Sequence, residues 1–147
     1  MDEIVTEIEI DAPPNAVWRV LTDFESYPEW NPVMKINGES MEGERLEVQM
    51  AYENMRPMTF RPTVLIVDEP IEFRWKGRLF VPGLYDGEHR FVLTELDDGG
   101  RTRLTHAETF RGPLVGFINR RIGDDVEVGF NQQNEALKQQ VEKQTAS

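Results

Sequence analysis

The sequence predicts an α+β fold in which a curved antiparallel sheet of about seven strands wraps around one long C-terminal helix. Two observations predict it. Apolar residues alternate with polar ones between residues 33 and 111, which is typical of strands. After Gly112-Pro113 the spacing changes to that of an amphipathic helix. A length of 147 residues suits a single domain spanning residues 1–147.

Residues 3–10 form the first expected strand, because isoleucines share one face of an alternating pattern there. Two consecutive prolines end that strand. A helix follows in which Val17, Leu21 and Phe24 recur at helical spacing. Pro28 then interrupts the helix, so two short helices are expected after the first strand.

The middle of the chain reads as successive antiparallel strands. Alternation is clearest at residues 71–76, where three large apolar side chains alternate with three charged ones. Turn sequences such as Asn37-Gly38 and Asp98-Gly99-Gly100 separate the strands. A sheet with one polar face must cover its other face, and only the last helix is long enough to do so. The sheet is therefore expected to curve around that helix.

Residues 12–32 read APPNAVWRVLTDFESYPEWNP, with paired prolines, a short amphipathic helix and two aromatic residues beside two further prolines. This segment, and the order of elements along nearly the whole chain, resembles the START-like superfamily (also called SRPBCC or Bet v 1-like). Its polyketide cyclase/dehydrase and lipid-transport subgroup is the one indicated. The resemblance implies a helix-grip fold with an internal cavity between sheet and helix. It also implies a small hydrophobic or amphipathic ligand, which is lipid-, sterol- or polyketide-like.

The expected strand near residues 102–110 and the strand before it indicate which polar side chains face the interior. His106 and Glu108 share a face with flanking apolar residues, and on the preceding strand His89 shares a face with Phe91. Directly opposed residues of an antiparallel hairpin share a face. We therefore expect Leu93 to lie opposite His106, and Phe91 opposite Glu108.

The expected interior is mostly apolar with a few convergent polar groups, which is the usual profile of a small-molecule site. Asn134 adds a polar group because it interrupts the apolar stripe of the long helix. The candidate ligand-binding residues are Met50, Tyr52, Phe60, Trp75, Tyr85, His89, Phe91, His106, Glu108, Phe130 and Asn134. The same pattern also suits a plain packed core in which every buried polar group has a partner.

An enzymatic alternative rests on His106 and Glu108, the two candidate catalytic residues. A histidine and a buried carboxyl group can move a proton at a carbon beside a carbonyl, as cyclisation of a polyketide requires. The sequence has no Gly-x-Ser-x-Gly motif and no cysteine, so no nucleophile is assigned. A third alternative is an interaction module, such as a co-chaperone domain of the same superfamily, which needs a functional outer face.

The sequence does not favour a metal site or a cofactor. His89, His106 and Glu108 would make a set of two histidines and one carboxylate, as in non-haem iron sites. No local motif supports this set, and no glycine-rich phosphate-binding loop is present. We therefore expect no metal and no cofactor.

Composition limits the partners and the location. The net charge is −11 at pH 7, and such a surface repels phosphate groups, so no nucleic acid partner is expected. The N-terminus lacks the basic start and apolar core of a signal peptide. The longest aliphatic run, residues 64–67, is far too short to span a bilayer. We therefore expect a cytoplasmic protein with no integral membrane segment.

Three connecting segments are unusually apolar: residues 55–58, 79–85 and 114–117. Exposed apolar loops tend to mark contact sites. We expect them to converge at the mouth of the cavity and act as a gate. The alternatives are a small satellite core and a homodimer contact.

Overall fold

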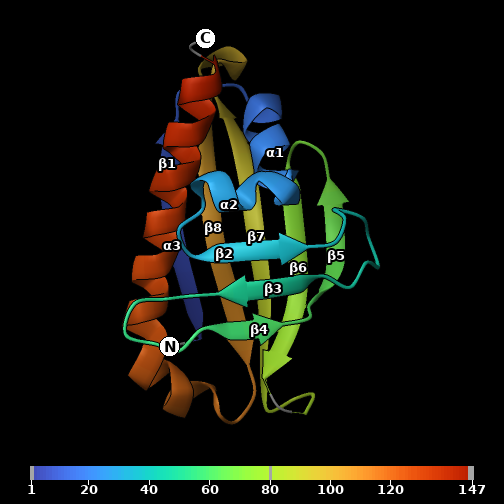
Figure 1. Ribbon diagram of the computed structural model, residues 1–147, viewed down its shortest axis with the longest axis vertical. Coiled ribbons are helices and arrows are strands. Elements are labelled where there is room, and N and C mark those ends of the chain that lie inside the picture. Colours follow the sequence, from blue (N-terminus) through green and yellow to red (C-terminus); the bar gives the residue numbers. More distant parts are fainter. Residues whose placement is uncertain (1, 80, 146–147) are drawn as a thin grey trace.

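Eight antiparallel strands in two sheets surround one face of a long helix in the computed structural model, which describes residues 2–79 and 81–145 (Figure 1). The strands are β1 (Glu3–Ile10), β2 (Met34–Asn37), β3 (Glu47–Met50), β4 (Met58–Phe60), β5 (Thr63–Asp68), β6 (Glu72–Leu79), β7 (Tyr85–Leu96) and β8 (Arg101–Arg111). The helices are α1 (Pro14–Thr22), α2 (Tyr27–Trp30) and α3 (Val115–Thr145), with short 3₁₀ turns η1 (Phe24–Ser26) and η2 (Asp97–Gly99).

The predicted fold class is confirmed, and the strands divide between a five-stranded sheet (β1-β8-β7-β6-β5) and a three-stranded sheet (β2-β3-β4). Pro62 separates β4 from β5, and its missing N–H group explains why a regular ladder does not continue through it. The sheets stay connected there, because the amide of Leu46 donates to the carbonyl of Pro62 at 2.9 Å. Figure 1 shows the strands of the small sheet running across those of the large one.

The helix α3 runs along β1 for much of its length (Figure 1). Its buried stripe includes Val126, Phe130, Leu137 and Val141, as the four-residue spacing predicts. Near its end, Lys138 Nζ donates to the carbonyl of Glu9 in β1 at 3.0 Å. The N-terminal half of α3 contributes Ile122 and Val126 to the pocket described below.

The short helices α1 and α2 close the other end of the molecule (Figure 1). Trp18 of α1 and Phe24 of η1 pack edge-on against Phe73 of β6, with ring centroids 6.4 and 5.8 Å apart. Such edge-to-face pairs stabilise a core beyond the area they bury. This end of the interior is therefore filled by side chains.

The register of β7 and β8 differs from the predicted one by two residues. Phe91 lies opposite His106, and His89 lies opposite Glu108, so the predicted pairs Leu93–His106 and Phe91–Glu108 are wrong. The reason is that the hairpin turn is centred one residue earlier than predicted. A two-residue shift keeps each side chain on its face, so the predicted sidedness is confirmed. No helix among the described residues is both long and apolar enough to cross a membrane.

Candidate functional site

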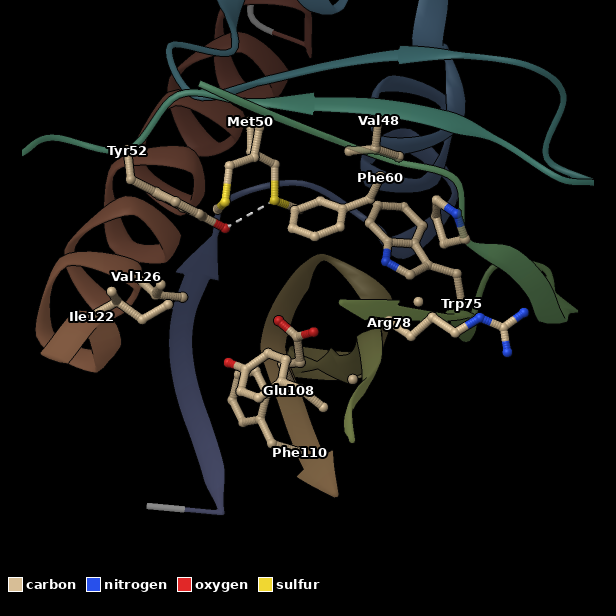
Figure 2. Close-up of a pocket in the computed structure, with 15 residues that line it drawn as sticks. Val48, Met50, Tyr52, Phe60, Trp75, Arg78, Glu108, Phe110, Ile122 and Val126 are labelled. Carbon is tan, nitrogen blue, oxygen red and sulfur yellow. Dashed lines mark hydrogen bonds between the residues drawn. The ribbon is translucent and has the colours of Figure 1, made fainter. Parts of the chain in front are cut away.

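An apolar pocket lies between the three-stranded sheet, β6 to β8 and the first turns of α3 (Figure 2). Its volume is about 60 Å³. Sites for drug-sized ligands span roughly 300–1,000 Å³, so this conformation admits a head group or a small molecule and excludes a whole sterol. The lining residues are Val48, Met50, Tyr52, Met58, Phe60, Pro62, Trp75, Gly77, Arg78, Tyr85, Gly87, Glu108, Phe110, Ile122 and Val126.

The predicted site residues separate into two groups. Those that line the pocket are Met50, Tyr52, Phe60, Trp75, Tyr85 and Glu108. Those that lie behind it in the core are His89, Phe91, His106, Phe130 and Asn134. Three members of this second group border a separate void of only about 10 Å³, which is at the lower limit for one water molecule. The second group is thus packed interior in this conformation.

Two tyrosines are held in place at the pocket wall. The hydroxyl of Tyr52 donates to the sulfur of Met50 at 3.3 Å, and that of Tyr85 donates to the amide oxygen of Asn119. Tyr85 was expected in an apolar loop but is the first residue of β7. Burial, and secondarily the charge of Glu108, raises the pKa of both tyrosines well above the ordinary value. Both hydroxyls therefore stay protonated in the physiological range.

Glycines make the space that the pocket occupies. Gly77 of β6 lies opposite Gly87 of β7, and both line the pocket. A Cβ atom at Gly87 would overlap the carboxylate of Glu108. The absence of two neighbouring side chains on one sheet face therefore leaves room for a carboxylate and for a ligand. The sequence analysis did not identify these glycines, although a glycine inside a strand is a known sign of close approach.

Among the described residues that line the pocket, Glu108 is the acidic one, and 18% of its side-chain surface is exposed to solvent. Its Oε1 lies 3.5 Å from Nδ1 of His89, the residue opposite it on β7. His89 is completely buried. The predicted acid–base partner of the carboxylate was His106, on the same strand. The shifted register places His89 opposite Glu108, where Phe91 was predicted.

Behind His89, a chain of buried hydrogen bonds crosses the core. Nε2 of His89 lies 2.7 Å from Nε2 of His106, and Nδ1 of His106 lies 2.8 Å from Oδ1 of Asn134. Nδ2 of Asn134 donates to the hydroxyl of Thr6 at 2.8 Å, and Thr6 donates to the carbonyl of His106 at 2.7 Å. Thr6 was not predicted, although it shares the alternating face of Ile4.

These contacts determine where the protons lie. A carbonyl only accepts, so Thr6 must donate to it and must accept from the amide nitrogen of Asn134. The amide oxygen of Asn134 then faces Nδ1 of His106, which must carry a hydrogen. Burial, followed by the nearby charge of His89, holds the pKa of His106 well below its ordinary value. His106 is therefore neutral, and its Nε2 accepts a hydrogen bond from Nε2 of His89.

With Nε2 of His89 acting as the donor to His106, its Nδ1 faces the carboxylate of Glu108 at 3.5 Å. This buried nitrogen has no hydrogen-bond partner among the described residues. The pair therefore places an imidazole nitrogen directly behind the carboxylate of the pocket.

Two of the three apolar segments lie side by side. The amide of Leu114 donates to the carbonyl of Leu84 at 3.2 Å, which joins the segment before β7 to the start of α3. The third segment contributes Met58 to the pocket lining. Phe80, in the second segment, lies outside the described residues. The gate remains a prediction, with its segments gathered at the pocket end of the molecule.

Among residues 2–79 and 81–145, no group of three or more histidine, aspartate or glutamate side chains is placed to hold a metal ion. The polar groups that line the pocket are a carboxylate, two phenols, an indole and one guanidinium. This set can bind polar atoms of an organic ligand and can transfer a proton.

A curved antiparallel sheet packed against a long C-terminal helix defines a START-like domain of the helix-grip class. The chain belongs to the family described as polyketide cyclase / dehydrase and lipid transport, whose model matches residues 1–142. No curated protein matches the sequence.

Solved structures show the same fold. An aromatase/cyclase, Zhui, from Streptomyces sp. R1128 is similar with a TM-score of 0.77 and 16% identity, covering 97% of this chain and 94% of that one. Protein MLL2253 from Mesorhizobium loti has a TM-score of 0.74 and 23% identity, over 96% and 97% of the two chains. A START superfamily protein from Mycobacterium smegmatis has a TM-score of 0.72 and 18% identity, over 97% and 99%.

Proposed function

We propose that this protein binds a small amphipathic molecule, lipid- or polyketide-like, in the pocket between its sheets and α3. The observation that supports this is a pocket with apolar walls and a single carboxylate, Glu108, within it. Apolar walls favour burial of a hydrocarbon or aromatic body, and a few polar groups orient it. The family description, which includes both cyclases and lipid transport, supports the same ligand class.

A variant whose side chain fills the pocket tests this proposal. Gly77 faces the pocket, and a Cβ atom there meets only an ordinary contact with Pro62 at 3.6 Å. The variant Gly77→Leu should keep the fold and occupy the cavity. Gly100→Leu is the matched control, because Gly100 lies in the turn between β7 and β8 and does not line the pocket.

Native mass spectrometry of protein purified from its own host gives the readout. We expect a bound small molecule on the wild type and on Gly100→Leu, and none on Gly77→Leu. A ligand retained equally by all three proteins would place binding elsewhere. An interior that takes up no ligand from its host or from amphipathic probes would overturn the proposal.

A second candidate function is proton transfer to or from the bound molecule, and the His89–Glu108 pair favours it. The carboxylate of Glu108 can take a proton from a carbon beside a carbonyl, which leaves an enolate, and the resulting carboxyl group can return the proton to that carbon. Deuterium incorporation at the α-carbons of 2-heptanone in D2O, followed by NMR, measures this step. Acceleration by the wild type that disappears in Glu108→Gln would support catalysis. Deuterium incorporation at the same rate as in buffer alone would indicate that the protein binds the molecule without catalysing proton transfer.

A further inference from the structure

The geometry of the pocket points to an organic cation as the polar end of the ligand: a quaternary or protonated amine with an apolar tail. This inference rests on the proposed binding function and names the class of molecule bound. It is supported by the aromatic walls, by the position of Glu108 and by the direction of Arg78, which are considered in turn.

Five of the fifteen residues that line the pocket are aromatic. Tyr52, Phe60, Trp75, Tyr85 and Phe110 all line it. Figure 2 shows Tyr52, Phe60 and Trp75 on one side and Phe110 on the other, with Glu108 between them. The faces of aromatic rings carry partial negative charge and attract cations, and several rings around one space form the cage that binds ammonium groups. Purely apolar ligands would not require rings in place of aliphatic side chains.

A carboxylate lies inside this aromatic enclosure. Glu108 forms no ion pair with lysine or arginine among the described residues, and Nδ1 of His89 lies 3.5 Å from its carboxylate. Its oxygens are directed into the pocket in Figure 2. A carboxylate in a poorly solvated space is costly unless a cation or a proton accompanies it. The aromatic faces and Glu108 therefore both favour a positively charged group on the ligand.

The second charged residue of the lining, Arg78, would favour an anion, but it is directed elsewhere. Arg78 is exposed, and in Figure 2 its guanidinium extends away from Glu108 toward the edge of the pocket. An anionic head group in contact with Arg78 would stay at the rim, in water. The net charge of −11 also concentrates cations rather than anions near the surface.

Three probes with one tail and different heads test the inference: hexyltrimethylammonium, hexanol and hexanoate. Binding to the wild type is measured by NMR titration of the Trp75 indole signal. We expect hexyltrimethylammonium to bind about tenfold more tightly than hexanol, and hexanoate to bind more weakly than both.

Variants identify the group responsible. Glu108→Gln should abolish the preference for the cation and leave the affinity for hexanol nearly unchanged. Glu88→Gln removes the same charge from a residue of β7 that does not line the pocket, and it should keep the preference. Failure of all three probes to bind would overturn the proposed function itself. Equal binding of cation and alcohol, or tighter binding of hexanoate, would overturn the cation inference while leaving a binding protein.

Discussion

Gly129, in the middle of α3, lies directly against the aromatic ring of Tyr52. A Cβ atom at position 129 would overlap the ring carbons Cδ1 and Cε1. The missing side chain thus lets the segment after β3 reach the helix backbone, and Tyr52 forms part of the pocket wall there. The wall of the pocket therefore depends on the lack of a side chain as much as on the tyrosine.

Gly129→Ala should destabilise the protein and displace Tyr52. Alanine favours a helix by about 1 kcal/mol relative to glycine, but overpacking a filled site costs roughly 1–3 kcal/mol, so the net effect is unfavourable. Gly116→Ala is the matched control in the same helix, because a Cβ atom at Gly116 meets nothing within 4 Å. It should be neutral or stabilising by up to about 1 kcal/mol. Urea unfolding measures the change in stability of each variant. Equal changes in the two variants would contradict the packing interpretation.

Gly87→Ala should move the carboxylate of Glu108 away from His89. The new methyl group would overlap the carboxylate, whose flexible side chain can turn away more easily than the strand backbone can shift. We expect hexyltrimethylammonium to lose about tenfold in affinity, as with Glu108→Gln, while the fold survives. Gly100→Ala is the control, because Gly100 does not line the pocket and a Cβ atom there meets only an ordinary contact. An unchanged affinity in Gly87→Ala would show that the position of the carboxylate does not matter.

His106 should remain neutral in the folded protein at pH values where a free histidine is charged. Burial is the main cause of its lowered pKa, and the nearby charge of His89 adds to it. The unfolded chain takes up a proton below its ordinary pKa of about 6.5, and the folded chain does not. Stability should therefore fall as the pH falls below that value, by up to about 1.4 kcal/mol per pH unit.

Two measurements check this behaviour of His106. Nitrogen-15 chemical shifts should show the neutral form with hydrogen on Nδ1 at pH 6. The slope of the unfolding free energy against pH should be shallower in His106→Gln than in the wild type. A protonated ring, or hydrogen on Nε2 alone, would contradict the donor and acceptor assignments derived from Thr6 and Asn134.

Asn134→Leu should destabilise the core by about 1–3 kcal/mol, because Nδ1–H of His106 would lose its acceptor while fully buried. The hydroxyl of Thr6 would also lose a donor. A double-mutant cycle with Thr6→Val separates these effects, and a coupling of at least about 0.5 kcal/mol is expected for residues in one hydrogen-bonded chain. Additive changes in urea unfolding would indicate that the contacts act independently.

The periodic spacing of apolar residues in the sequence predicted many features of the structure correctly. The alternation along β7 and β8 correctly directed His89, Phe91, His106 and Glu108 inward, because sidedness depends only on a period of two. The pairing between these strands was wrong by two residues, because register depends on where the turn closes. That one difference placed His89, and not Phe91, opposite Glu108.

The sequence by itself determined the fold class, the order of elements and which side chains face the interior, because these follow from local patterns of apolar residues. Only the tertiary structure decided which interior residues border the pocket and which are packed core. Gly77 and Gly87 leave space in the pocket, and Gly129 lets Tyr52 of a distant segment form part of its wall. The size of the pocket depends on how closely the sheets and α3 approach one another. No local sequence pattern encodes that separation.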